Sequence, residues 1–90
     1  MAHVAFTPHL RAFFDLPEGM DVEASTLAAL LDALDGRWPG FAFYVIDERK
    51  HIRKHVAIWI DGTCITDRTS IDLPLEPASR VYILQALSGG

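Results

Sequence analysis

A single apolar stripe at helical spacing most constrains what this chain can fold into. Four leucines occupy the i, i+3, i+4 and i+7 positions that share one helix face: Leu27, Leu30, Leu31 and Leu34. Ser25 or Thr26 is suited to cap the start of this helix. Gly36 can close it in a left-handed cap, and Pro39 forbids its continuation. The sequence therefore predicts one main helix that buries its leucines.

Alternating apolar and polar residues on both sides of this helix predict strands. We expect the strands at His3–Thr7, Met20–Ala24, His55–Ile60 and Arg80–Gln85, with a short one at Thr63–Thr66. The Asp61-Gly62 pair is a strong hairpin signal between two of them. Val4 and Phe6 should point inward in the first strand, and Val81 and Ile83 in the last.

The segments between these strands are less regular. The predictions are one short helical turn in His9–Leu16, a turn at Leu16–Gly19, a solvated polar connector at Asp47–Lys54 and a loop at Asp67–Ser79. Gly40–Ile46 is rich in β-formers but follows a proline, so strand and short helix both remain open. A hairpin, one helix and then further strands indicate an α+β fold: a β-grasp, with a mixed sheet of four to five strands.

The length of 90 residues predicts a single domain, and a hydrophobic content of 50% is ample for a folded core. A net charge of −4 argues against nonspecific binding to nucleic acid. The basic residues at 49–55 are local, and we interpret them as part of the solvated connector. One cysteine, no apolar run near ~18 residues and no leader pattern predict a cytoplasmic protein that spans no membrane.

No residue pattern in the chain is typical of an enzyme's own active site. Cys64 has no neighbour that would activate a thiol, so we interpret it as a packing residue. His51 and His55 are four apart but lie in a connector without a third ligand, so no metal site is expected. The carboxylates are scattered. We therefore expect a chain that acts together with partner enzymes.

The end of the sequence is the feature that points to chemistry. The final strand runs into Ala86, Leu87 and Ser88 and stops at Gly89-Gly90. Because glycine has no Cβ, such a tail can enter a channel too narrow for ordinary side chains. We expect 86–90 to project freely beyond the sheet. An α-carboxylate is a poor electrophile at neutral pH, so it would first need activation, for example as an acyl-adenylate.

Three motifs in the sequence resemble those of a known protein family. The strand and turn HVAIWIDG, the capped helix STLAALLDAL and the ending VYILQALSGG resemble those of the MoaD/ThiS sulfur carriers, which are ubiquitin-like β-grasp proteins. The resemblance covers nearly the whole chain, and the tail is its most specific part. The chain is longer than the shortest thiamine-type carriers, around Asp47–Lys54, and in this it is more similar to the carriers paired with a cysteine synthase.

This resemblance implies a role for the tail and a set of partners. Gly90 would be adenylated by an E1-like enzyme and converted to a thiocarboxylate, with Gly89 and Ser88 as its neighbours in the partner's channel. The activating partner would use ATP and magnesium, and this chain would bind no cofactor. A synthase would then accept the sulfur. Molybdopterin, thiamine, cysteine and other sulfur-containing products all remain open as the product of the pathway.

Strand alternation also predicts a docking face. The residues turned away from the helix, which we expect to contact the E1-like partner, are Ala57, Trp59, Tyr82 and Leu84, with Ala5 beside them. The alternative is that the connector or the Asp67–Ser79 loop covers them.

Other roles for the tail remain open. One is a protein modifier, in which Gly90 forms isopeptide bonds. Another is the small subunit of molybdopterin synthase, and a third is a binding module whose last two glycines have no role.

Overall fold

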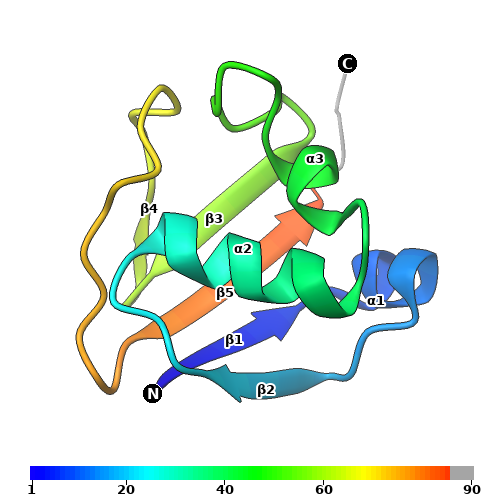
Figure 1. Ribbon diagram of the computed structural model, residues 1–90, viewed down its shortest axis with the longest axis horizontal. Coiled ribbons are helices and arrows are strands. Elements are labelled where there is room, and N and C mark those ends of the chain that lie inside the picture. Colours follow the sequence, from blue (N-terminus) through cyan, green and yellow to red (C-terminus); the bar gives the residue numbers. More distant parts are fainter. Residues whose placement is uncertain (86–90) are drawn as a thin grey trace.

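A computed structural model describes residues 1–85 of the chain. Within them, a mixed sheet has the order β2-β1-β5-β3-β4. The strands are β1 (Ala2–Phe6), β2 (Gly19–Val22), β3 (Val56–Ile60), β4 (Thr63–Cys64) and β5 (Arg80–Gln85). The helices are α1 (Pro8–Phe14), α2 (Leu27–Arg37) and α3 (Phe41–Val45). Figure 1 shows α2 lying across one face of the sheet, which confirms the predicted fold class.

The two terminal strands lie side by side at the centre of the sheet. β1 and β5 run parallel, and every other pairing in the sheet is antiparallel. The expected N-terminal hairpin is present as β1 and β2, although α1 lies between the two strands. β2 spans Gly19–Val22. The predicted strand was Met20–Ala24, so β2 begins one residue earlier and ends two residues earlier than predicted. β5 has the predicted bounds.

The helix α2 begins as predicted but ends differently. The Thr26 hydroxyl accepts a hydrogen bond from the Ala29 amide at 3.1 Å, which caps the helix. The prediction that Gly36 closes it is wrong, because α2 continues to Arg37. The left-handed glycine is Gly40 instead, with φ of 95°, where the chain turns into α3. A proline at position 39 still prevents the helix from continuing.

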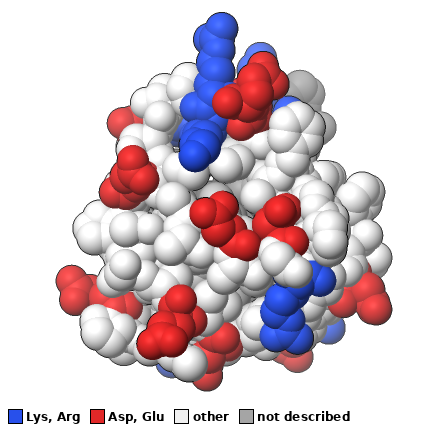
Figure 2. Space-filling model, viewed as in Figure 1, with Lys and Arg blue, Asp and Glu red and all other residues white. Residues whose placement is uncertain are grey.

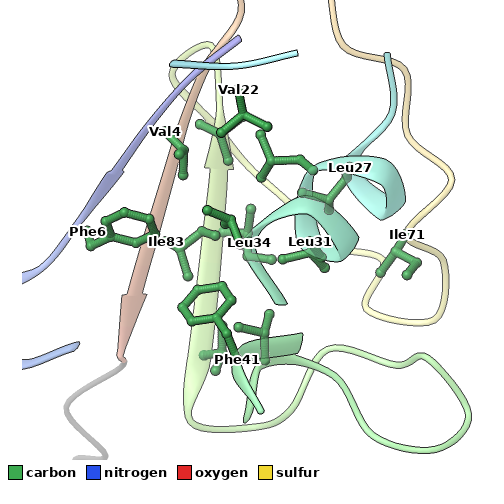
Figure 3. Close-up of a cluster of buried hydrophobic side chains, with 14 of the residues drawn as sticks. Val4, Phe6, Val22, Leu27, Leu31, Leu34, Phe41, Ile71 and Ile83 are labelled. Carbon is green, nitrogen blue, oxygen red and sulfur yellow. The ribbon is translucent and has the colours of Figure 1, made fainter. Parts of the chain in front are cut away.

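The hydrophobic core lies between α2 and the inner face of the sheet (Figure 3). All four leucines of the predicted stripe are buried, as are the inward residues of β1, β3 and β5: Val4, Phe6, Val56, Ile58, Val81 and Ile83. In Figure 3 Phe41 and Ile71 complete this core from α3 and from the long loop before β5. The ambiguous segment Gly40–Ile46 is therefore a short helix, α3, which turns Phe41 and Val45 inward.

The connector between α3 and β3 is held in place by a buried side chain and by hydrogen bonds. Ile52 is buried, and its amide donates to the carbonyl of Arg68 at 2.8 Å. The Asp47 carboxylate accepts from the amides of His51 and Arg49 at 3.0 and 2.9 Å. These amides hold the pKa of Asp47 below its usual range, the His51 amide most strongly. The prediction of a fully solvated connector is thus wrong, because one apolar side chain ties it to the core.

Charges of both signs are dispersed over the helix-covered face (Figure 2). In this view Asp and Glu are scattered, while Lys and Arg lie in separate groups, one of them at the top. Among the helices of residues 1–85, none is both long and apolar enough to cross a membrane.

Candidate functional site

The predicted docking residues form one continuous patch on the sheet face opposite α2. Trp59 lies directly across from Tyr82, and Ala57 from Leu84, while Ala5 pairs with Tyr82 from the other side. Trp59 and Tyr82 are 40% and 39% exposed, and the other three are partly buried. We call these residues the outer patch: Ala5, Ala57, Trp59, Tyr82 and Leu84. Neither the connector nor the long loop shields the two large aromatic side chains from solvent.

A shallow depression of about 360 Å³ opens beside Trp59 and Tyr82. His3, Ala5, Gly62 and Arg80 are among the residues that line it. The His3 imidazole contacts the carboxylate of Asp21 at 3.0 Å, and no Lys or Arg side chain within residues 1–85 forms a salt bridge. The exposed guanidinium of Arg80 is thus available at the rim. An apolar floor with a cation beside it suits a partner that offers an apolar side chain and a carboxylate.

The hairpin turn that borders this depression also fixes the start of β5. Asp61 and Gly62 have φ values of 51° and 85°, as the hairpin signal predicts. The Asp61 carboxylate accepts from the Arg80 amide at 2.8 Å and from the buried Ser79 hydroxyl at 3.0 Å. From the sequence alone, Asp61 is recognisable only as a turn residue. Its hydrogen bonds to Ser79 and Arg80 could not be predicted, because the sequence does not show which loop lies next to the turn.

The end of β5 is where the tail begins. The Tyr44 hydroxyl donates a hydrogen bond to the Gln85 side-chain oxygen at 2.8 Å. Burial raises the pKa of Tyr44, so the hydroxyl keeps the proton that it donates. The strand reaches Gln85, as predicted. The predicted tail residues Ser88, Gly89 and Gly90 lie outside the described residues, so their roles stay predictions.

The remaining candidate residues do not assemble into a second site. Cys64 is half-buried, and its thiol contacts the Ile65 carbonyl at 3.8 Å. The His55 ring packs edge-on against the ring of Tyr44. In the part of the chain that the structure describes, no three His, Cys, Asp or Glu side chains are grouped so that they could hold a metal ion.

Comparison with known proteins gives matches in structure alone. No family model and no curated protein sequence matches the chain. A chain of the Amycolatopsis orientalis BexX/CysO complex matches with a TM-score of 0.84 at 14% identity, and the match covers 100% of both chains. This chain has the ubiquitin-like β-grasp fold.

Two further structures support the same conclusion. Mycobacterium tuberculosis CysO matches with a TM-score of 0.83 at 17% identity, over 97% of this chain and 100% of that one. The small archaeal modifier protein 1 from Methanosarcina acetivorans matches with a TM-score of 0.78 at 17% identity, over 99% and 95%. At such identities the likeness establishes the β-grasp fold.

Proposed function

We propose that this chain is a sulfur carrier that presents the carboxylate of Gly90 to partner enzymes. The observation that carries the proposal is that the last described strand, β5, is central in the sheet and ends directly before residues 86–90. The central strand β5 leads through Gln85 into the residues ALSGG, on the fold that the chain shares with CysO and with an archaeal modifier. A tail anchored by a central strand can be held at a defined position while a partner acts on its end.

The chemistry follows from what a carboxylate requires. In the activating step, the Gly90 carboxylate attacks the α-phosphorus of ATP and pyrophosphate leaves, which forms an acyl-adenylate. Hydrosulfide then attacks the acyl carbon, AMP leaves and a thiocarboxylate remains. The partner supplies ATP, magnesium and the catalytic groups, and this chain contributes the carboxylate and its position. A synthase would then take the sulfur for a cofactor or an amino acid.

The outer patch is proposed as the surface that meets the E1-like partner. Ordering a five-residue tail in a channel costs roughly 1–2 kcal/mol per residue in backbone entropy. Docking elsewhere must offset that cost. The exposed aromatic pair Trp59 and Tyr82, with Arg80 at the rim of the adjoining depression, offers apolar area and a cation for this purpose.

A direct test is ATP–pyrophosphate exchange catalysed by the cognate E1-like enzyme. Adding one residue after Gly90 moves the carboxylate away from the α-phosphate, so exchange should be lost while the melting temperature is unchanged. Gly90→Ala adds a methyl group in the narrow channel and should strongly reduce exchange. Normal exchange by the extended chain, in the absence of a protease that could trim it, would show that the terminus is not the reacting group.

Protein modification is the second candidate, favoured by the likeness to an archaeal protein named as a modifier. The activating step would be the same, but a lysine amine would attack the acyl group and leave an isopeptide bond. The role of small subunit in a molybdopterin synthase would use the thiocarboxylate within a complex. Conjugates on lysine side chains of other proteins would distinguish modification from both sulfur-transfer roles.

A further inference from the structure

A second aromatic cluster surrounds the point where β5 ends. The ring of Tyr44, whose hydroxyl bonds Gln85, lies 5.0 Å from the ring of Phe13 and 5.3 Å from that of Phe14. The imidazole of His55 lies 4.8 Å from the Tyr44 ring. We call Phe13, Phe14, Tyr44 and His55 the exit cluster. Phe13 and Phe14 come from α1, Tyr44 comes from α3, and His55 directly precedes β3.

The exit cluster exposes more aromatic surface than the fold requires. Phe14 packs its ring against the core residue Phe41 at 5.3 Å, which explains why α1 lies over this end of the sheet. Phe13 has no such role and is 64% exposed. Phe43, on α3, is 61% exposed. An exposed aromatic ring in contact with partly buried ones, as Phe13 is with Phe14 and Tyr44, is typical of a surface that meets another molecule.

A cation lies against Phe43, the residue that precedes Tyr44 in α3. The Arg53 guanidinium lies 4.5 Å from the centre of the Phe43 ring, and its Nε donates to the Phe43 carbonyl at 2.7 Å. The Arg53 amide donates to the Val45 carbonyl at 2.9 Å. The Arg68 guanidinium donates in turn to the Arg53 carbonyl. The connector therefore holds Arg53, which is partly exposed, next to α3.

The length of the tail determines which surface a tail-binding partner must touch. Five residues follow Gln85 in the sequence. A fully extended residue spans at most about 3.6 Å, so Gly90 can lie no farther than about 18 Å from Gln85. A partner that encloses Gly90 within a channel must therefore bring the mouth of that channel close to Gln85. The exit cluster is in contact with Gln85 through Tyr44.

We propose that the exit cluster and Arg53 form a docking surface for the mouth of a partner's tail-accepting channel. The mouth would offer apolar side chains to Phe13 and a carboxylate to Arg53. This inference rests on the proposed function, because it needs a partner that acts on Gly90. The occupant is the enzyme that activates Gly90, because the mouth of its channel must receive this short tail.

The test compares the same new charge at the two ends of β5. Phe13→Glu introduces a carboxylate into the exit cluster. Ala78→Glu is the control, since Ala78 is exposed and lies two residues before β5 begins, at the strand end opposite Gln85. In ATP–pyrophosphate exchange with the full chain, Phe13→Glu should raise the KM for the carrier at least about tenfold. Ala78→Glu should leave it within about twofold. Thermal unfolding checks that both variants are folded.

A second variant tests the charge. Arg53→Gln should raise the KM, and its KM should depend less on ionic strength than that of the wild-type chain, because the neutral side chain removes an attraction between opposite charges that salt screens. An unchanged KM for Phe13→Glu, beside normal exchange by the wild-type chain, would overturn this inference and leave the proposed function standing. So would a wild-type dimer that Phe13→Glu converts to a monomer. No exchange by the wild-type chain would overturn the proposed function itself.

Discussion

At the scale of single residues, the chain separates the side chains that hold the fold from those that face solvent. Trp59 and Tyr82 pair across two antiparallel strands, yet both are well exposed. Alternation along β3 and β5 was sufficient to predict this, because a strand with a buried face must turn every second residue outward. The role of Asp61 could not be predicted in this way. Its hydrogen bonds to Ser79 and Arg80 join residues eighteen and nineteen positions apart.

Trp59 should be an anchor of the outer patch. Truncation to alanine removes most of its apolar surface, so Trp59→Ala should weaken binding to the E1-like partner by about 1–2 kcal/mol. Trp59→Phe keeps a planar apolar ring and should lose less. Isothermal titration calorimetry with the purified partner measures both. Equal affinity of the alanine variant and the wild-type chain would exclude the outer patch as the docking surface.

At the scale of elements, local signals predicted the start of α2 and the whole of β5. The cap at Thr26 and the leucine spacing depend only on neighbouring residues. The identity of α3 could not be decided locally, because its residues favour strands while Gly40 and the buried positions of Phe41 and Val45 favour a helix. Packing against the core decided that conflict. The burial of Ile52 was missed for the same reason, since a tertiary contact determines it.

The packing of α2 against the sheet should dominate stability. Leu31 is buried in the core, and truncation of a buried leucine to alanine costs about 2–5 kcal/mol. Leu31→Ala should therefore lower the free energy of unfolding by that amount. Ala33→Gly, at an exposed position of the same helix, should lower it by about 1 kcal/mol, the difference in helix propensity. Denaturant unfolding measures both, and an unchanged midpoint for Leu31→Ala would mean that the helix packs differently.

The hydrogen bonds to Asp47 in the connector should make the free energy of unfolding depend on pH in the acid range. Hydrogen bonds to the Asp47 carboxylate lower its pKa in the folded chain, so its contribution to stability is present above its unfolded pKa, about 3.9. That contribution is lost as pH falls through the lower folded pKa. Asp47→Asn should flatten the dependence of the unfolding free energy on pH below about 4. Asp32→Asn removes the same charge from the exposed part of α2 and controls for net charge. Identical acid profiles for Asp47→Asn and the wild-type chain would contradict this role.

At the scale of the whole molecule, the fold places two surfaces around one strand. β5 lies between β1 and β3, carries Tyr82 and Leu84 of the outer patch and ends at Gln85 beside the exit cluster. The order of predicted elements was enough to indicate the β-grasp, because a hairpin, a helix and further strands pack in few ways. The exit cluster could not be predicted, since α1, α3 and His55 are brought together only by the complete fold.

The central claim is that Gly90 carries sulfur, and the intact mass of the protein isolated from its native host tests it most directly. A fraction of the chain should be heavier than the sequence mass by one exchange of oxygen for sulfur. Fragmentation should place that shift on Gly90, and mild alkylation of the thiocarboxylate should move it further. A chain found solely with an unmodified carboxylate, or solely joined to lysine side chains of other proteins, would contradict the claim.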